Sequence, residues 1–330
     1  MAREADPRTE SIRRDLELHL RRTDPTWRVR EVAPMPHGHS GFTYQVTALD
    51  SRGDRVLVLR LPPPGARPLG PADVVRQARI VSTLKGQAFP VPAVIAKSEQ
   101  TAIDGRPFAL FEMAHGWRVE EAELHIDGPR LASNAVETLK RLHRVPVEET
   151  GLAEEPVCLA RDLTRWHTLL EHARADMNLP FADLRRALAS SFPDEHQPCL
   201  VHGDYHCGNL LFDSTGAVVA VLDWEIAELG QPLIDLSCLA VAGMSRGDLM
   251  VGPVPGPAVE AAELASLYGA DASELEWYCA FSCYKYAAVY AYNLMLHRRG
   301  KRIDSFNEGL EPLIDQLVRR GLGLLAHELS

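Results

Sequence analysis

The segment of residues 199–225, CLVHGDYHCGNLLFDSTGAVVAVLDWE, constrains the fold of this chain more than any other segment. It opens with a short apolar run and the triplet His202-Gly203-Asp204, and Asn209 follows Asp204 by five residues. Residues 210–222 then predict a β-hairpin, because two apolar runs flank the turn sequence Asp-Ser-Thr-Gly. The second run ends directly before Asp223.

The hairpin suggests where the polar side chains of this segment meet. A hairpin brings its two ends together, so Asn209 and Asp223 should lie close in space. With Asp204 they would place two carboxylates and one amide oxygen at one spot. Oxygen ligands of this kind suit Mg²⁺. Phosphoryl transfer needs such a set, because one carboxylate orients the attacking hydroxyl and two oxygen ligands hold the metal.

Two other interpretations of the same residues remain open. His202, Asp204 and His206 alternate as they would on one face of a strand, which could form a transition-metal site of a metal-dependent hydrolase. No further histidine cluster with ligand spacing follows, so this interpretation is the weaker one. A buried hairpin with polar residues at its turns is the plainest alternative, but it does not explain three convergent oxygen ligands.

The pattern resembles the aminoglycoside phosphotransferase and choline kinase group, which are small-molecule kinases with a protein-kinase-like fold. The motif His202-Gly203-Asp204-x-x-x-x-Asn209 and the later triplet Asp223-Trp224-Glu225 carry this resemblance. The segments VLRLPPPG and LDWEIAELGQPLIDL are closest to the phosphotransferases related to the domain fused to some acyl-CoA dehydrogenases. The resemblance covers most of the chain, roughly residues 30–300.

The resemblance implies roles for five residues. Asp204 would be the catalytic base or the group that orients the hydroxyl, and Asn209 and Asp223 would be Mg²⁺ ligands. His202 would brace the loop. Asp235 would brace the same loop from the start of a helix, although a helix-capping role is also open. Only eleven residues separate Asp223 from Asp235, too few for the long activation segment that seats a peptide, so we expect no protein substrate.

Nucleotide-binding residues are expected before this segment. Gly38, Ser40 and Gly41 lie between two strand-like runs, at the position that covers the nucleotide phosphates in the resembling fold, although a hairpin turn would also use glycine. Residues 55–61 predict a strand by alternation, and Arg60 stands near its end. By resemblance Arg60 occupies the position of the nucleotide-binding lysine, where a guanidinium can bind phosphate oxygens in bidentate fashion. A solvated strand end is the simpler alternative.

The following helix, predicted over residues 72–84, departs from the family pattern. It should carry a glutamate that pairs with the cation of the strand, and Gln77 stands at the matching place. A neutral amide can accept a hydrogen bond from Arg60 but cannot neutralise it. A nucleotide-binding module with little turnover is therefore an alternative function.

The resemblance also sets the expected architecture, a bilobal α+β protein-kinase-like fold. We expect a nucleotide-binding lobe with a small antiparallel sheet at residues 1–111, a hinge at 112–117, and a larger helical lobe at 118–330 for catalysis and acceptor binding. At the hinge the Glu112 carbonyl and the Ala114 amide would bond the purine edge. Backbone atoms of this kind do not distinguish ATP from GTP.

Two late segments predict helices. Residues 277–296 form an aromatic helix that should be mostly core, with one or two tyrosines at the acceptor pocket. Residues 304–328 carry leucines at helical spacing and predict a closing amphipathic helix.

Composition limits the partners. A net charge of −10 over 330 residues argues against a nucleic-acid partner, and six cysteines without CxxC spacing indicate neither a zinc site nor a disulfide framework. The N-terminal sequence lacks a signal-peptide core, and the apolar stretches are too short to span a membrane. We therefore expect a cytoplasmic kinase without a membrane partner, which uses Mg²⁺ and ATP or GTP to phosphorylate a small-molecule hydroxyl acceptor.

Overall fold

The computed structural model describes residues 7–35, 42–67, 69–173, 180–248, 259–301 and 305–326. The chain divides into two compact units, which we call the sheet unit and the helical unit. The sheet unit comprises Met1–His115, Glu149–Gly151 and Ala220–Ile226, and the helical unit comprises Gly116–Glu148, Leu152–Val219 and Ala227–Ser330. The hinge expected at residues 112–117 stays a prediction.

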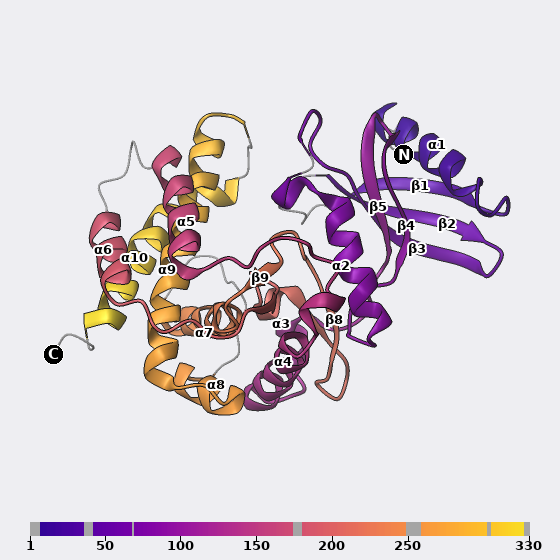
Figure 1. The fold of residues 1–330 in the computed structure, drawn as a ribbon. Helices are drawn as coiled ribbons and strands as arrows, with labels where there is room; N and C mark the ends of the chain where they lie inside the picture. Colours follow the sequence, from indigo (N-terminus) through magenta and orange to yellow (C-terminus); the bar gives the residue numbers. More distant parts are fainter. Residues whose placement is uncertain are drawn as a thin grey trace. The chain divides into compact units, whose positions relative to one another are not determined.

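The sheet unit is built on five antiparallel strands in the order β1-β2-β3-β5-β4 (Figure 1). The small antiparallel sheet predicted from the sequence is therefore present. Two longer helices, α1 and α2, accompany it. The elements are α1 (Pro7–Leu20), β1 (Arg28–Pro34), β2 (Thr43–Asp50), β3 (Gly53–Arg60), α2 (Val74–Gly86), β4 (Val94–Ile103) and β5 (Arg106–Glu112), with a 3₁₀ turn at Gly70–Ala72.

Alternation along β3 separates residues buried in the core of the sheet unit from residues on the opposite, more exposed face of the strand. Leu57 and Leu59 are fully buried and belong to the same apolar cluster as Ile12 and Leu16 of α1. The spacing of four residues puts these two α1 side chains on one face of the helix. Arg60 follows Leu59 and therefore points to the opposite face of the strand, as the period of two predicts.

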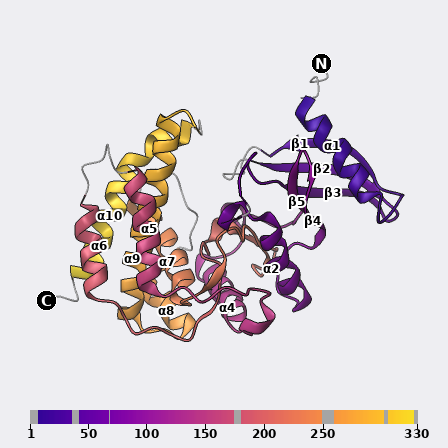
Figure 2. The same cartoon turned by 45° about the horizontal axis from the view of Figure 1, so that its top comes forward.

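The helical unit is organised around α9 (Figure 2), and α5, α6, α7, α8 and α10 each pack against this helix. Its helices are α3 (Val119–Ala122), α4 (Gly128–His143), α5 (Leu159–Ala173), α6 (Phe181–Ser190), α7 (Leu233–Asp248), α8 (Ala261–Tyr268), α9 (Ala272–Arg298) and α10 (Leu310–Ala326). Among the described residues that follow α4, 3₁₀ turns lie at Val147–Glu149, Cys207–Asn209 and Ser305–Gly309.

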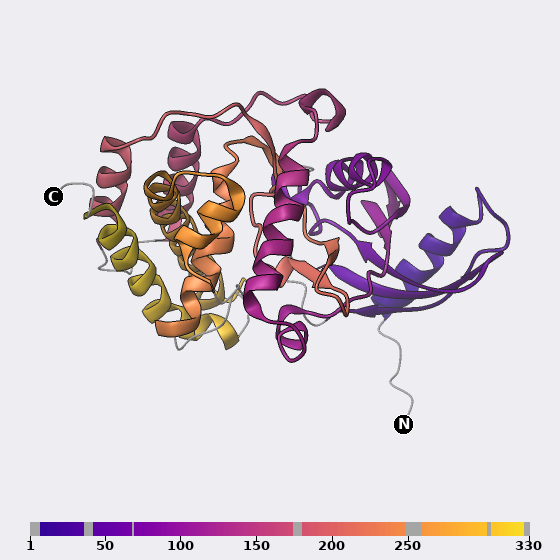
Figure 3. The same cartoon turned by 90° about the horizontal axis from the view of Figure 1, so that it is seen from below.

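The centre of α9 is buried on all sides, as expected for a helix that is apolar around most of its circumference. Figure 3 shows the same helices from below, with α10 in yellow alongside α9. Trp277, Tyr278, Phe281 and Tyr284 are at most 1% exposed. The prediction that most of the aromatic residues of this helix form core is therefore confirmed.

Two short antiparallel pairs frame the motif segment. β6 (Cys199–Val201) pairs with β9 (Glu228–Gly230), and β7 (Leu210–Phe212) pairs with β8 (Val218–Val221). The second pair is the predicted hairpin. Its turn is closed by the carboxylate of Asp213, which accepts the N–H groups of Thr215 and Ala217. In the part of the chain that the structure describes, no helix is long and apolar enough to cross a membrane.

Candidate active site

The residues between β6 and β7 form what we call the Asp204 loop, residues 202–209. Asp235 lies fully buried in the first turn of α7 and fixes the start of this loop. Its carboxylate accepts the backbone N–H of His202 at 2.7 Å and that of Gly203 at 2.8 Å. Gly203 has φ +81°, a conformation that favours glycine. His143 Nε2 lies 3.2 Å from the same carboxylate.

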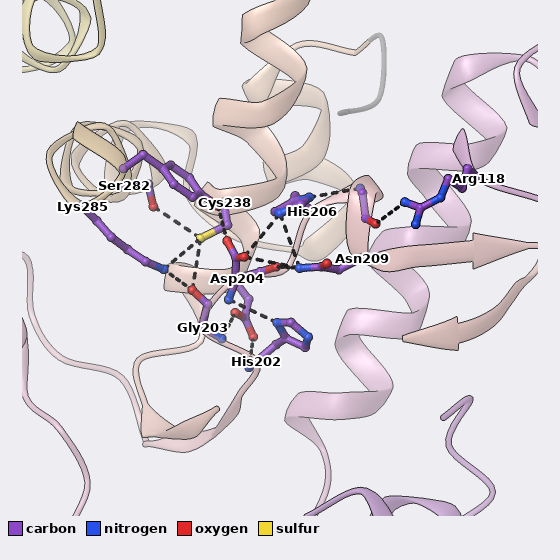
Figure 4. A network of polar contacts seen from close by, with 12 residues as sticks. Arg118, His202, Gly203, Asp204, His206, Asn209, Cys238, Ser282 and Lys285 are labelled. Atoms are coloured by element: carbon purple, nitrogen blue, oxygen red, sulfur yellow. Dashed lines mark hydrogen bonds and ion pairs between the residues drawn. The ribbon is translucent and has the colours of Figure 1, made fainter. Parts of the chain in front are cut away.

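The Asp204 side chain is held by three neighbours and remains 31% exposed (Figure 4). Oδ1 accepts the hydroxyl of Tyr286 at 2.8 Å, and Oδ2 lies 3.4 Å from Nε2 of His206. The amide of Asn209 donates to the Asp204 main-chain oxygen at 3.0 Å and lies 3.4 Å from Oδ2. His202 is completely buried, and its Nδ1 accepts the Asp204 N–H at 3.2 Å.

A buried lysine, Lys285, contacts the main chain of the Asp204 loop. Lys285 of α9 is 2% exposed, and its ammonium donates to the main-chain oxygen of Gly203 and lies 3.7 Å from Sγ of Cys238 (Figure 4). Burial lowers the pKa of Lys285, but the surrounding groups, Cys238, Asp204, Asp162 and Asp235, outweigh that effect and raise its pKa above the ordinary value. The ammonium therefore stays charged inside the unit.

These neighbours also determine the charge of Asp204. Burial by itself would raise the pKa of Asp204. The charge and hydrogen bond of His206, the charge of Lys285 and the Tyr286 hydroxyl act in the opposite direction and hold the pKa of Asp204 well below its usual range. Asp204 is therefore an ionised carboxylate that is oriented on one side and accessible on the other, as a group that accepts a hydrogen bond from a substrate hydroxyl must be.

The sheet unit contains a second polar cluster, which we call the Arg60 cluster. Nη1 of Arg60 lies 2.9 Å from Oδ1 of Asp223, and Nη2 lies 3.0 Å from Oε2 of Glu225. The side chains of Arg60, Asp223 and Glu225 are 15%, 42% and 27% exposed. Burial lowers the pKa of Arg60, but the two carboxylates outweigh it and raise the pKa of Arg60. Asp223 has φ +63°, a left-handed conformation that costs a residue other than glycine about 1 kcal/mol or more.

The residues expected to hold Mg²⁺ have suitable donor atoms. The amide nitrogen of Asn209 contacts the main chain and side chain of Asp204, and its amide oxygen is the atom that could bind a cation. The Asp223 carboxylate is 42% exposed. Both groups therefore offer oxygens that a hard cation accepts. The convergence of Asp204 and Asn209 with Asp223 stays a prediction.

The transition-metal alternative finds less support. Within the described ranges, no group of three His, Cys, Asp or Glu side chains is arranged to hold a metal ion. His202, one of its three expected ligands, is turned inward, where Nδ1 accepts a backbone N–H.

The remaining predicted nucleotide-binding residues are spread over the sheet unit. Gln77 is 2% exposed and its amide donates to the Pro71 carbonyl at 2.9 Å. Glu112 ends β5, and its N–H donates to the Ala93 carbonyl. Ala114 lies in the irregular segment that follows and is partly buried. Gly38, Ser40 and Gly41 lie outside the described residues.

Sequence reasoning missed Lys285 and Tyr286 as neighbours of Asp204. One signal was present, because Lys285 is the only charged residue between positions 277 and 296. A single charge in an otherwise apolar helix must either reach solvent or find a buried partner. The pairing of Arg60 with Glu225 was also missed, since residues so distant in sequence meet only in the folded chain.

The chain has a bilobal kinase-like α+β fold, with a sheet unit and a helical unit that carries the Asp204 loop. The model of the phosphotransferase enzyme family matches residues 31–278, and the chain belongs to this family. The aminoglycoside phosphotransferase and choline kinase resemblance read from the motifs is thereby confirmed.

Known proteins similar to this chain fall into two groups. Acyl-CoA dehydrogenase family member 11 of Gallus gallus is 28% identical over 294 residues, which are 80% of this chain and 38% of that protein. The chain thus spans less than half the length of this curated relative. A candidate aminoglycoside phosphotransferase from Ralstonia eutropha superposes with a TM-score of 0.75 at 20% identity and covers 95% of this chain and 98% of its own.

A third similar protein was solved with ligands. It is a thermostable mutant of an aminoglycoside phosphotransferase in a ternary complex with AMP-PNP and hygromycin B. Its TM-score is 0.63 at 17% identity, with 94% of this chain and 99% of that chain covered. At such identities the solved structures define the fold alone.

Proposed function

We propose that this chain is a small-molecule O-phosphotransferase, which transfers the γ-phosphoryl group of ATP or GTP to a hydroxyl of its acceptor in the cytoplasm. The observation that carries the proposal is the state of Asp204. Its carboxylate is ionised, oriented by the Tyr286 hydroxyl at 2.8 Å and partly exposed, on a loop that Asp235 fixes. A family of phosphotransferases with such a carboxylate suits transfer to a hydroxyl.

Each site residue has a role in this proposal. Asp204 orients the acceptor hydroxyl and accepts its proton, while Arg60 binds phosphate oxygens. Asn209 and Asp223 would hold Mg²⁺, which supplies charge neutralisation at the phosphates when it is bound. His202 braces the loop through its bond to the Asp204 N–H.

The other predicted site residues would contact the nucleotide. The glycine-containing segment with Gly38, Ser40 and Gly41 would cover the phosphates. The backbone of Glu112 and Ala114 would bind the purine edge.

The central test is a phosphate-transfer screen with Mg²⁺ and either ATP or GTP, combined with thermal-shift binding. The panel includes aminoglycosides, macrolides, choline-like amines and hydroxyacyl thioesters, chemistries that suit the family and the relatives. Asp204→Ala should lower turnover by about 10²–10⁴-fold, the usual contribution of a general base, and leave Mg²⁺-nucleotide binding nearly intact. Asp183→Asn, an exposed site on α6, is the control. A rate near that of the wild type in Asp204→Ala would refute the assignment.

The second candidate is a nucleotide-binding module without turnover, which the neutral Gln77 favours. It predicts Mg²⁺-nucleotide binding by the wild type without phosphate transfer to any acceptor of the panel. Turnover that appears only in Gln77→Glu would identify the missing carboxylate as the cause.

A further inference from the structure

The charge partners of Arg60 come from one short segment. Two acidic residues that follow β8, Asp223 and Glu225, each bind a different nitrogen of the same guanidinium, at 2.9 Å and 3.0 Å. Because each carboxylate binds one prong of the planar fork, the two contacts fix both its direction and its rotation. A single carboxylate on one nitrogen would leave the rotation free.

The helix that precedes β4 supplies no such charge. Gln77 is neutral, and its amide is directed to the Pro71 carbonyl in the turn before α2. Two carboxylates of the Asp223–Glu225 segment bind Arg60 directly and compensate its charge.

The segment that carries Glu225 is rigidly anchored. Trp224 is 2% exposed, its indole N–H donates to the Val221 carbonyl at 3.0 Å, and its ring meets that of Phe89 edge to face at 6.1 Å. A large buried ring fixes the backbone on both sides of it. Glu225 thus reaches Arg60 from a supported position rather than from a loose loop.

We infer that Glu225 positions Arg60 for the nucleotide phosphates and replaces, from the strand-end segment, a carboxylate that α2 does not carry. This inference rests on the proposed function. Asp223 cannot fill this role alone, because it is the expected metal ligand, and a carboxylate that binds a cation shares its oxygens with that cation. Glu225 is then the partner that remains with Arg60. It acts through Arg60 and is a positioning residue.

The first experiment compares Glu225→Gln with the wild type in the phosphate-transfer assay. The variant keeps the size of the side chain and removes its charge. We expect kcat/KM for the nucleotide to fall about tenfold, since a misplaced binding group loses its orientation, while KM for the acceptor stays within about twofold. The control is Glu99→Gln, which removes the exposed ion pair with Arg79 in the same unit and should leave both parameters unchanged.

A double-mutant cycle separates positioning from an independent role. Arg60→Gln, Glu225→Gln and the double variant are measured under the same conditions. If Glu225 acts through Arg60, the double variant should be no slower than Arg60→Gln within about twofold, because the second change removes nothing further. If the rate losses of the two single variants multiply in the double variant, Glu225 acts on the metal or the acceptor directly, and the inference is overturned.

Folding and function are checked separately. Circular dichroism and thermal unfolding of Glu225→Gln should match the wild type, because both carboxylates of the cluster are partly exposed. A wild type that neither binds Mg²⁺-nucleotide nor transfers phosphate would overturn the proposed function and this inference together. An active wild type whose kcat/KM is unchanged by Glu225→Gln would overturn this inference alone.

Discussion

The Arg60 cluster and the Asp204 loop both place a cation beside carboxylates, but they do so in opposite surroundings. Arg60 lies between carboxylates that are 42% and 27% exposed. Lys285 is 2% exposed, and of the acidic residues in its neighbourhood Asp162 and Asp235 are 5% and 0% exposed, while Asp204 is 31% exposed. Both carboxylates that pair with Arg60 can be reached by water, whereas the Lys285 ammonium and two of its acidic neighbours are enclosed.

This difference in exposure implies that Arg60 can exchange its partners, whereas Lys285 cannot. Partly exposed carboxylates are hydrated when they lose an ion pair, so the Arg60 contacts contribute little to stability and can yield to phosphate oxygens. A buried charge without its partner is strongly destabilising. Lys285 therefore belongs to the scaffold that holds the Asp204 loop.

The largest expected effect is on stability. Lys285→Met should lower the free energy of unfolding by about 2–3 kcal/mol, because it removes the charged donor to the buried Gly203 main-chain oxygen. Arg60→Met should lower it by about 1 kcal/mol or less. Chemical denaturation of both variants measures the comparison, and equal losses would show that the two surroundings are energetically alike.

The next effect is on the pH dependence of stability. The pKa of Asp204 is lower in the folded state than in the unfolded state, so its stabilisation is present above the unfolded pKa, near 4, and is lost as the pH falls towards the folded pKa. The advantage of the wild type over Asp204→Asn should be constant from about pH 8 to 5, of the order of 1–2 kcal/mol, and should shrink below about pH 4. An advantage that grows on acidification would contradict the assignment.

A smaller effect is expected at the hydroxyl that orients Asp204. Tyr286→Phe removes one hydrogen bond at 2.8 Å and should lower stability by about 1 kcal/mol and kcat by about tenfold. Tyr290→Phe is the matched control, because Tyr290 stacks on Tyr286 at 6.1 Å and shares its helix. Steady-state kinetics of both variants should show a loss only in Tyr286→Phe.

The last prediction concerns the accessibility of the cysteine thiols and is tested on the wild-type protein, without any substitution. Burial raises the pKa of Cys283 to about 12, and Cys238, beside Lys285, is completely buried and also has a raised pKa. Cys158 is exposed. Alkylation at pH 8 followed by mass spectrometry should therefore label Cys158 rapidly and Cys283 and Cys238 only after unfolding. Rapid labelling of Cys238 would show that the surroundings of Lys285 are open.

Local patterns predicted the hairpin, the alternation along β3 and the position of Asp235 at the start of a helix, because turn residues, period and order along the chain determine them. β9 was not predicted, since its three residues become a strand only by pairing with β6. The contacts of Lys285 and Tyr286 with the Asp204 loop also join distant segments. The pairing of Arg60 with Glu225 spans 165 residues, and periodicity carries no information at that separation.

The left-handed backbone of Asp223 limits how this position can change. Aspartate and asparagine tolerate such a conformation better than most side chains, because they bond to nearby backbone groups. In a library randomised at position 223, folded clones should be enriched in glycine, asparagine and aspartate. Of these three, only aspartate brings a negative charge. Aspartate is therefore the acidic residue that suits both the left-handed backbone and the need for a negative charge at position 223. Glutamate would supply the charge but tolerates this backbone conformation poorly.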